Sequence, residues 1–213
     1  MPDDKKKTGA VIKPRFEFRT FGRNFDEIHK RMASLSGPVP EFARKRVSSE
    51  IYILSRTTDL TNCKISDQKI DIKSLIKVED DLEQWEPVLK MDFPLFKKTI
   101  IKNVFRPLWA RAPFIDKEDH SVEKFLEVVK KHPDLQLVNV DKERYGFIVN
   151  NTICEYAIVY INGAMVVTVS AESVKKNNVL KTIEKLGMDG FENMNYIKAI
   201  RQVLGWADLT PNE

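Results

Sequence analysis

The chain has 213 residues, of which 42% are hydrophobic and 31% charged, which supports one large domain or two small ones with a real core. A net charge of +4 is too small to indicate a nucleic-acid-binding protein by itself. No segment has the roughly 20 apolar residues of a membrane helix, and the first residues lack the apolar core of a signal peptide. We therefore expect no membrane contact and a cytoplasmic protein.

Several common catalytic and binding motifs are absent from the sequence. There is no glycine-rich phosphate loop and no G-x-S-x-G nucleophile motif, and the histidines and cysteines lack zinc-binding spacing. Cys63 and Cys154 have no C-x-x-C spacing and fall within expected strands, which predicts reduced, buried thiols. If the protein binds phosphate, it must do so with side chains.

The first expected element is a strand at 15–21, RFEFRTF, in which charged and aromatic residues alternate. Arg15, Glu17 and Arg19 share one face, and Phe16 and Phe18 share the other. We interpret these aromatic residues as part of the core. An alternative is an RNA-binding surface with bases stacked between arginines, and it would use Phe16, Phe18, Phe21, Arg15, Arg19 and Arg23.

A helix and three strands are expected next. The helix ends before the GPVP break, and its apolar stripe consists of Phe25, Ile28, Met32 and Leu35. The basic run at 44–46 is interpreted as a solvated loop. Strands are expected at 48–56, 62–66 and 69–76, and a turn at Asp67-Gln68 would pair Ile65 with Ile70. The polar face of the last two strands then carries Lys64, Lys69, Asp71 and Lys73.

The second half of the chain is expected to contain helices and two more strand pairs. Residues 78–113 are interpreted as an irregular connection that leads to a helix at about 96–105, and Ser121 caps the next helix. Strands at 135–140 and 144–149 precede a hairpin at 154–173, and two helices follow at about 178–186 and 195–204. Short turns between consecutive strands imply antiparallel pairing, so the chain is α+β. We expect one domain at 15–205, with an N-terminal tail at 1–14 and a C-terminal tail at 206–213.

The hairpin CEYAIVYINGAMVVTVSAES carries two glutamates among apolar residues. Asn162-Gly163 is a strong signal for a two-residue turn of type I′. With Ile161 opposite Ala164, Glu155 lies opposite Ser170, and Glu172 is the diagonal neighbour of Glu155 on the same face. The turn therefore predicts a carboxylate pair on one side of the sheet.

Other expected strands also have one apolar and one charged face. One interpretation is a half-exposed antiparallel sheet with its polar face in water. The alternative is a sheet that closes into a barrel, which removes its exposed edges. With the charged faces inward and the helices packed outside, the barrel would be a tunnel lined by lysines, arginines and a few carboxylates. Such a tunnel requires a highly charged anion to offset the desolvation of its cations.

The order of elements and three stretches resemble the CYTH superfamily, the triphosphate tunnel metalloenzymes. The stretches are 16–19, which resembles the E-x-E-x-K/R strand of the family, 62–73, and 153–172 with the helices after it. The resemblance implies an eight-stranded antiparallel tunnel that binds triphosphate compounds. Members include class IV adenylate cyclases, thiamine triphosphatases, RNA triphosphatases and polyphosphate enzymes, in which basic residues hold phosphate and glutamates hold Mg²⁺ or Mn²⁺.

Carried over residue by residue, the resemblance implies two sets of site residues. The phosphate-binding set is Arg15, Arg19, Lys64, Lys73 and Arg144. The metal-binding set is Glu17, Glu155 and Glu172. Arg15 and Ser170 replace two glutamates of the family pattern, so one metal fits this chain better than two. No residue is assigned as the general base.

Two functions follow from the resemblance. The first is a metal-dependent phosphohydrolase or phosphotransfer enzyme for a triphosphate or polyphosphate compound, with Mg²⁺ or Mn²⁺ as the cofactor. The second is a binding module of the same fold, without turnover, for a nucleotide or polyphosphate. A small-molecule partner is expected in both cases, and the sequence leaves the substrate and the oligomeric state open.

Overall fold

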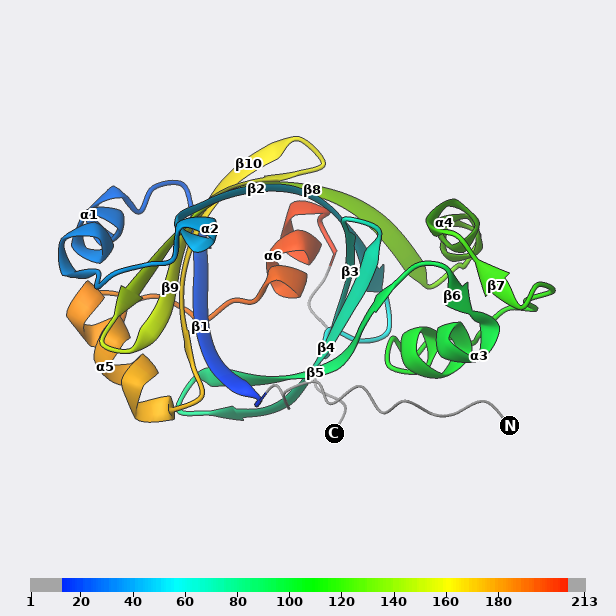
Figure 1. Cartoon of the computed structure of the whole chain (residues 1–213), viewed down its shortest axis with the longest axis horizontal. Helices are drawn as coiled ribbons and strands as arrows, with labels where there is room; N and C mark the ends of the chain where they lie inside the picture. The colour runs from blue at the N-terminus through cyan, green and yellow to red at the C-terminus, as the bar shows by residue number, and fades with distance from the viewer. Residues whose placement is uncertain (1–12, 207–213) are drawn as a thin grey trace.

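The structure, a computed structural model, describes residues 13–206 (Figure 1). Residues 1–12 and 207–213, which make up most of the two expected tails, lie outside the described residues. Within 13–206, no helix is long and apolar enough to cross a membrane. Cys63 and Cys154 are both free and buried, as the sequence predicts.

Eight antiparallel strands close into a barrel, which confirms the predicted α+β barrel fold. Their order around the barrel is β1-β10-β9-β8-β2-β3-β4-β5, and β5 pairs back to β1. The strands are β1 (Arg15–Gly22), β2 (Lys45–Ser55), β3 (Thr61–Ser66), β4 (Lys69–Glu79), β5 (Leu82–Asp92), β8 (Leu135–Val149), β9 (Thr152–Ile161) and β10 (Ala164–Ser173).

The remaining elements lie mostly between or after the barrel strands. The connections inside the chain are α1 (Asp26–Leu35), α2 (Glu41–Arg44), β6 (Leu95–Phe96), α3 (Lys97–Thr99), the π-helix η1 (Ile100–Phe105), β7 (Asp119–His120) and α4 (Val122–Lys130). After the last strand come α5 (Lys176–Leu186) and α6 (Tyr196–Val203). Ser121 caps α4 and Asn195 caps α6, each by accepting a backbone N–H of the first turn.

Both predicted hairpin turns are present with the predicted registers. Asn162 and Gly163 have φ of 46° and 89°, the positive values that a type I′ turn requires. Ile161 pairs with Ala164 and Glu155 with Ser170. Residues 67 and 68 also have positive φ, of 50° and 59°, and this turn pairs β3 with β4 as expected. These turns fix which side chains face the barrel interior, because a one-residue slip would reverse every side chain.

Two strand predictions are wrong. Residues 135–149 form one continuous strand, β8, because it pairs along its length with both β2 and β9. The charged segment at 141–143 is therefore the middle of a long strand rather than a turn. Residues 82–92, expected as irregular, form β5 and complete the barrel. Pro87 fits there because the register between β4 and β5 shifts next to it.

Two apolar layers cover the outside of the barrel at opposite ends of the molecule (Figure 1). Phe16 and Phe18 from β1 pack in one layer with residues of α1 and α5. In the other layer, η1 and α4 pack on β3 and β4. Because Phe16 and Phe18 are buried, the alternative of an RNA-stacking surface on β1 is wrong.

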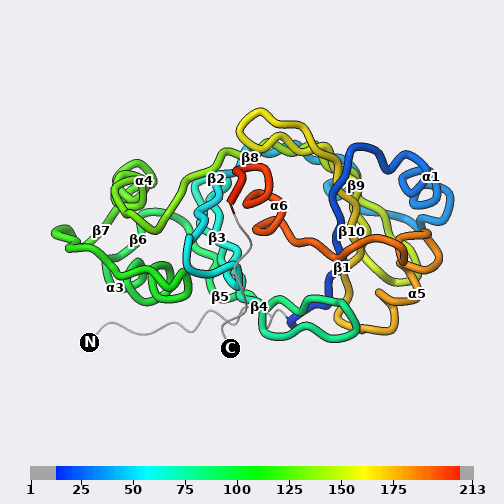
Figure 2. The backbone as a smooth tube through the Cα atoms, turned by 180° about the vertical axis from the view of Figure 1, so that it is seen from behind, coloured from blue at the N-terminus to red at the C-terminus, as the bar shows by residue number. Residues whose placement is uncertain are grey.

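The final helix, α6, departs from the expectation that all helices pack outside. It lies within the opening of the barrel in both views (Figure 2). Tyr196, Ile197 and Ile200 of α6 pack against inward-facing residues of β2, β8 and β9, which are Tyr52, Leu54, Val138, Val140, Ala157, Val159 and Ile161. This apolar packing fills one end of the barrel, and the charged residues occupy the rest of the interior.

Candidate functional site

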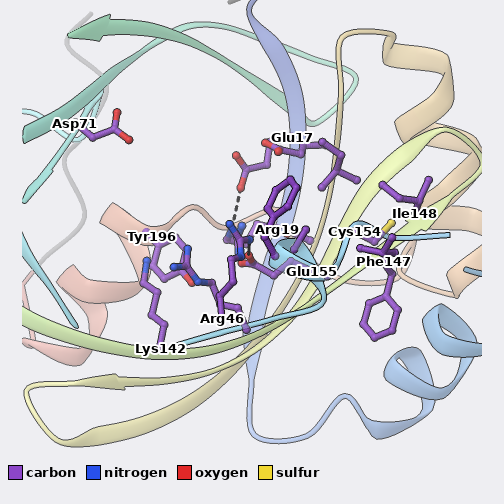
Figure 3. Close-up of a pocket in the computed structure, with 18 of the residues that line it drawn as sticks. Glu17, Arg19, Arg46, Asp71, Lys142, Phe147, Ile148, Cys154, Glu155 and Tyr196 are labelled. Carbon is purple, nitrogen blue, oxygen red and sulfur yellow. Dashed lines mark hydrogen bonds and ion pairs between the residues drawn. The ribbon is translucent and has the colours of Figure 1, made fainter. Parts of the chain in front are cut away.

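The charged faces of the strands line one cavity of about 430 Å³ inside the barrel (Figure 3). The closed barrel is therefore the correct alternative, and the half-exposed sheet is wrong. Of the residues predicted from the sequence, the structure brings together on this cavity Glu17, Arg19, Lys64, Lys73, Arg144, Glu155 and Glu172. They come from β1, β3, β4, β8, β9 and β10.

Arg15 lies at the open end rather than in this cavity. Its guanidinium pairs with Glu172 at 2.8 Å, and 42% of its side chain is exposed. It lines a neighbouring cavity of about 250 Å³ that shares Glu17, Lys73 and Glu172 with the main one. Arg15 therefore lies at the entrance, while the other predicted cations line the main cavity.

Arg19 is the centre of the first charge network. Its Nε donates to Glu17 Oε1 at 2.8 Å, and its Nη1 lies 3.4 Å from Glu155 Oε1 (Figure 3). Its guanidinium also lies 4.6 Å from the ring centre of Tyr196 on α6. Burial acts to raise the pKa of Glu17, but the charges of Arg19, Lys73 and Lys142 and the hydrogen bond from Arg19 together outweigh it and lower that pKa. Glu17 and Arg19 are thus both charged at neutral pH.

Glu50 is the centre of a second network, which the sequence analysis did not assign to the site. Its Oε2 lies 2.8 Å from Lys142 Nζ and 3.1 Å from Lys64 Nζ, and its Oε1 lies 3.7 Å from Arg144. Only 2% of its side chain is exposed. Burial acts to raise its pKa, but Lys142, Lys64 and Arg144 outweigh it and lower the pKa to about 2. Glu50 is thus the internal counter-ion of three cations.

Lys142 is the second residue that the sequence analysis missed. Its Nζ donates to Tyr52 Oη at 2.8 Å and lies 3.7 Å from the ring centre of Tyr196. Burial and then the Lys64 charge lower its pKa to about 7, although Glu50 opposes this. Side chains alternate between the two faces of a strand, so Lys142 shares the inward face of Arg144. A prediction of one strand over 135–149 would therefore have placed Lys142 in the site.

Arg46 was interpreted as part of a solvated loop, and that interpretation is wrong. It belongs to β2, lines the cavity, and its Nη2 lies 3.3 Å from Glu155 Oε2. Glu155 is therefore held between Arg46 and Arg19 (Figure 3). Asp71, expected on the same face as Lys64 and Lys73, also lines the cavity.

Three buried polar atoms of cavity-lining residues have no hydrogen-bond partner within residues 13–206. They are Nε of Arg144, the hydroxyl of Tyr196 and Oδ1 of Asn62. An unsatisfied buried polar group costs about 1–3 kcal/mol, so such groups in a folded protein call for a bound ligand or ordered water. Arg144 Nε and the Tyr196 hydroxyl can donate to an anion in the cavity, whereas Asn62 Oδ1 can only accept a hydrogen bond.

Two carboxylates of the cavity wall lie side by side and are candidate ligands for a divalent cation. Glu17 and Glu172 are direct cross-strand partners, and burial and then the Glu17 charge raise the pKa of Glu172. A cation between them would relieve this repulsion. No group of three metal-ligating side chains occurs in the described part of the chain. With only these two adjacent carboxylates, a divalent cation at this place would need its remaining ligands from water or phosphate.

Comparison with known proteins shows similarity in structure only. No family model and no curated protein matches the sequence. A candidate adenylyl cyclase from Hippeastrum, described as having a dominant triphosphatase activity, is 11% identical over 91% of this chain and 97% of its own, with a TM-score of 0.47. A candidate adenylate cyclase from Bacillus halodurans is 10% identical over 88% and 98%, with a TM-score of 0.49. A conserved protein from Pyrococcus furiosus is 13% identical over 87% and 98%, with a TM-score of 0.47.

The fold is evident from the strands of this chain without any of these comparisons. Eight antiparallel strands form a closed barrel whose charged side faces inward. This is the fold that the resemblance to the triphosphate tunnel metalloenzymes predicts, and the resemblance is confirmed at the level of the fold.

Proposed function

We propose that the protein binds a triphosphate or polyphosphate compound inside the barrel and hydrolyses it with the help of Mg²⁺ or Mn²⁺. The observation that supports this most directly is the convergence of cationic side chains on one enclosed cavity. They are Arg19, Arg46, Lys64, Lys73, Lys142 and Arg144. Enclosed cations bind phosphate strongly because the surrounding protein screens charge less than water does.

The phosphate chain would lie between the two charge networks. Lys64, Lys142 and Arg144 share the single carboxylate of Glu50, so together they keep excess positive charge for an anion. Arg144 Nε and the Tyr196 hydroxyl would gain the hydrogen bonds that they lack. Arg15 would contact the ligand at the entrance. These groups bind and orient the chain, which is most of what phosphoryl transfer needs from a protein.

The divalent cation would be held by Glu17 and Glu172, with Glu155 as a third carboxylate. When bound, it would neutralise charge on the phosphate oxygens and lower the pKa of a bound water. Glu17 and Glu172 each pair with an arginine through Oε1, so the second carboxylate oxygen of each could bind the cation with the ion pair intact. Glu155 has both oxygens paired, with Arg19 and Arg46, so one of these arginines must move before Glu155 can bind metal.

A second candidate is a binding module without turnover. The observation in its favour is that each proposed metal ligand is already paired with an arginine: Glu17 with Arg19, Glu155 with Arg19 and Arg46, and Glu172 with Arg15. These pairs would suffice for a protein that only captures the anion.

One experiment separates the two candidates. The protein is incubated with tripolyphosphate, ATP or thiamine triphosphate and Mg²⁺ or Mn²⁺, while phosphate release and the melting temperature are measured. Hydrolysis predicts release that Glu172→Gln abolishes and that Glu27→Gln, an exposed control on α1, leaves unchanged. A higher melting temperature without release would favour the binding module. No effect of any polyanion on melting or release would refute both.

A further inference from the structure

The cavity is not ionic throughout. Toward the open end of the barrel its lining becomes apolar, and we call this part the mouth shelf. The shelf consists of Val39, Pro40, Phe42, Ile148 and Ile153. The Phe42 side chain is largely in solvent, with 79% of the residue exposed. A solvent-exposed aromatic ring beside a strongly charged cavity indicates a contact surface for an apolar part of a ligand.

The shelf directly continues the charged face of two strands. On β9, Ile153 is the inward residue that follows Glu155 toward the mouth. On β8, Ile148 lies beyond Gly146 and Arg144 on the same face. Two residues of a strand span about 6–7 Å, so the lining of the cavity changes from ionic to apolar between one inward-facing residue and the next.

The α2 segment is fixed over β8 by specific contacts. Gly37 N–H donates to the carbonyl of Ile148 at 2.8 Å, and Ile148 N–H donates to the Ser36 hydroxyl at 3.1 Å. A Cβ at Gly146 would lie only 2.3 Å from the carbonyl oxygen of Ala43, so glycine is what allows this close approach. Phe42 is therefore held at the mouth by a formed structure.

We infer that the ligand is an organic triphosphate whose phosphate chain enters the ionic part while its organic group rests on the mouth shelf. This rests on the proposed function and narrows its substrate class. An inorganic polyphosphate would gain nothing from Phe42, Ile148 and Ile153, because apolar side chains offer its oxygens neither a hydrogen bond nor a positive charge. An ester with a flat or apolar group would instead cover these side chains. Arg46, at the junction, can contact the group that links the two parts.

The test compares ligands that share a triphosphate ester. Methyl triphosphate supplies the phosphate chain with almost no organic bulk, and ATP, UTP and thiamine triphosphate add a base or a heterocycle. Dissociation constants are measured by calorimetry in EDTA, so that no metal-dependent turnover interferes. We expect at least one of the three larger ligands to bind about tenfold or more tightly than methyl triphosphate, because burial of part of a ring gives at least that gain.

Two exposed phenylalanines provide a matched pair of variants. Phe42→Ala is expected to remove most of this preference without changing the affinity for methyl triphosphate. Phe114→Ala is the control, since Phe114 is 90% exposed and does not line the cavity. Neither change removes buried packing, so both variants should fold.

The outcomes distinguish this inference from the function on which it rests. If methyl triphosphate binds as tightly as all three larger ligands, or if Phe42→Ala leaves the preference intact, the inference is wrong and the proposed function stands. If no triphosphate binds at all, the proposed function fails and the inference fails with it.

Discussion

Glu50 offers the sharpest test of the charge arrangement in the barrel. Its carboxylate is the shared counter-ion of Lys64, Lys142 and Arg144. Glu50→Gln preserves the shape of the side chain but removes the charge. Its pKa is lowered from 4.5 to about 2 in the folded protein, and one pKa unit corresponds to about 1.4 kcal/mol. We therefore expect the variant to lose about 3 kcal/mol of folding stability at pH 7, consistent with the loss of one partner from a buried ion pair.

The pH dependence follows from the same shift. Because the pKa of Glu50 is lower in the folded than in the unfolded chain, its contribution is complete above pH 4.5 and is lost as the pH falls toward about 2. Urea denaturation at several pH values measures this. The difference in unfolding free energy between the wild type and Glu50→Gln should be largest at neutral pH and should shrink below pH 4.5.

Ligand rescue provides the second part of the assay. In Glu50→Gln the three cations lack their internal counter-ion, so tripolyphosphate should raise the melting temperature of the variant more than that of the wild type. Without ligand, a loss of about 3 kcal/mol lowers the melting temperature by about 6–12 °C in a chain of this size. Glu27→Gln, which removes an exposed carboxylate paired with Lys30, should change little. The reasoning is refuted if Glu50→Gln melts like Glu27→Gln and tripolyphosphate stabilises both equally.

Three further predictions concern the cavity, the mouth and the outer core. Lys142 has a pKa of about 7 and faces Glu50, Tyr52, Lys64, Glu155 and Tyr196, so it should take up a proton when a polyphosphate binds at pH 8. The binding enthalpy measured by calorimetry should then vary with the ionisation enthalpy of the buffer. Lys142→Met should abolish this dependence on the buffer. Gly146→Ala should cost about 1–3 kcal/mol in urea denaturation, because its Cβ collides with the Ala43 carbonyl; a variant as stable as wild type would show that α2 is not held there. Phe125→Ala, at a fully buried residue of α4, should cost about 3–5 kcal/mol, and a loss below 1 kcal/mol would contradict this packing.

Local patterns in the sequence were enough to predict the hairpins and the charged faces. Asn162-Gly163 determines a turn within two residues, and every inward side chain of β9 and β10 follows from its register. The alternation in β1 likewise placed Glu17 and Arg19 on one face and the phenylalanines on the other. These predictions succeeded because each depends on a few adjacent residues.

The errors occurred where distant parts of the chain decide the structure. The charged segment at 141–143 is compatible with a turn, and only pairing with β2 and β9 makes it a strand, so Lys142 was missed. Glu50 lies in the strand expected at 48–56, but its role depends on cations from β3 and β8. The apolar side of α6 predicts burial, but it cannot distinguish packing inside the barrel from packing outside.

The position of α6 has a consequence for how a ligand could enter and leave the barrel interior. Apolar side chains of α6 pack across one end of the barrel interior, so a ligand of the proposed kind would enter and leave at the opposite end, where Arg15 is exposed. If a long polyphosphate were bound, this packing would stop its chain from passing through, and only its terminal part would reach the charged cavity. Hydrolysis there would shorten such a chain from its ends.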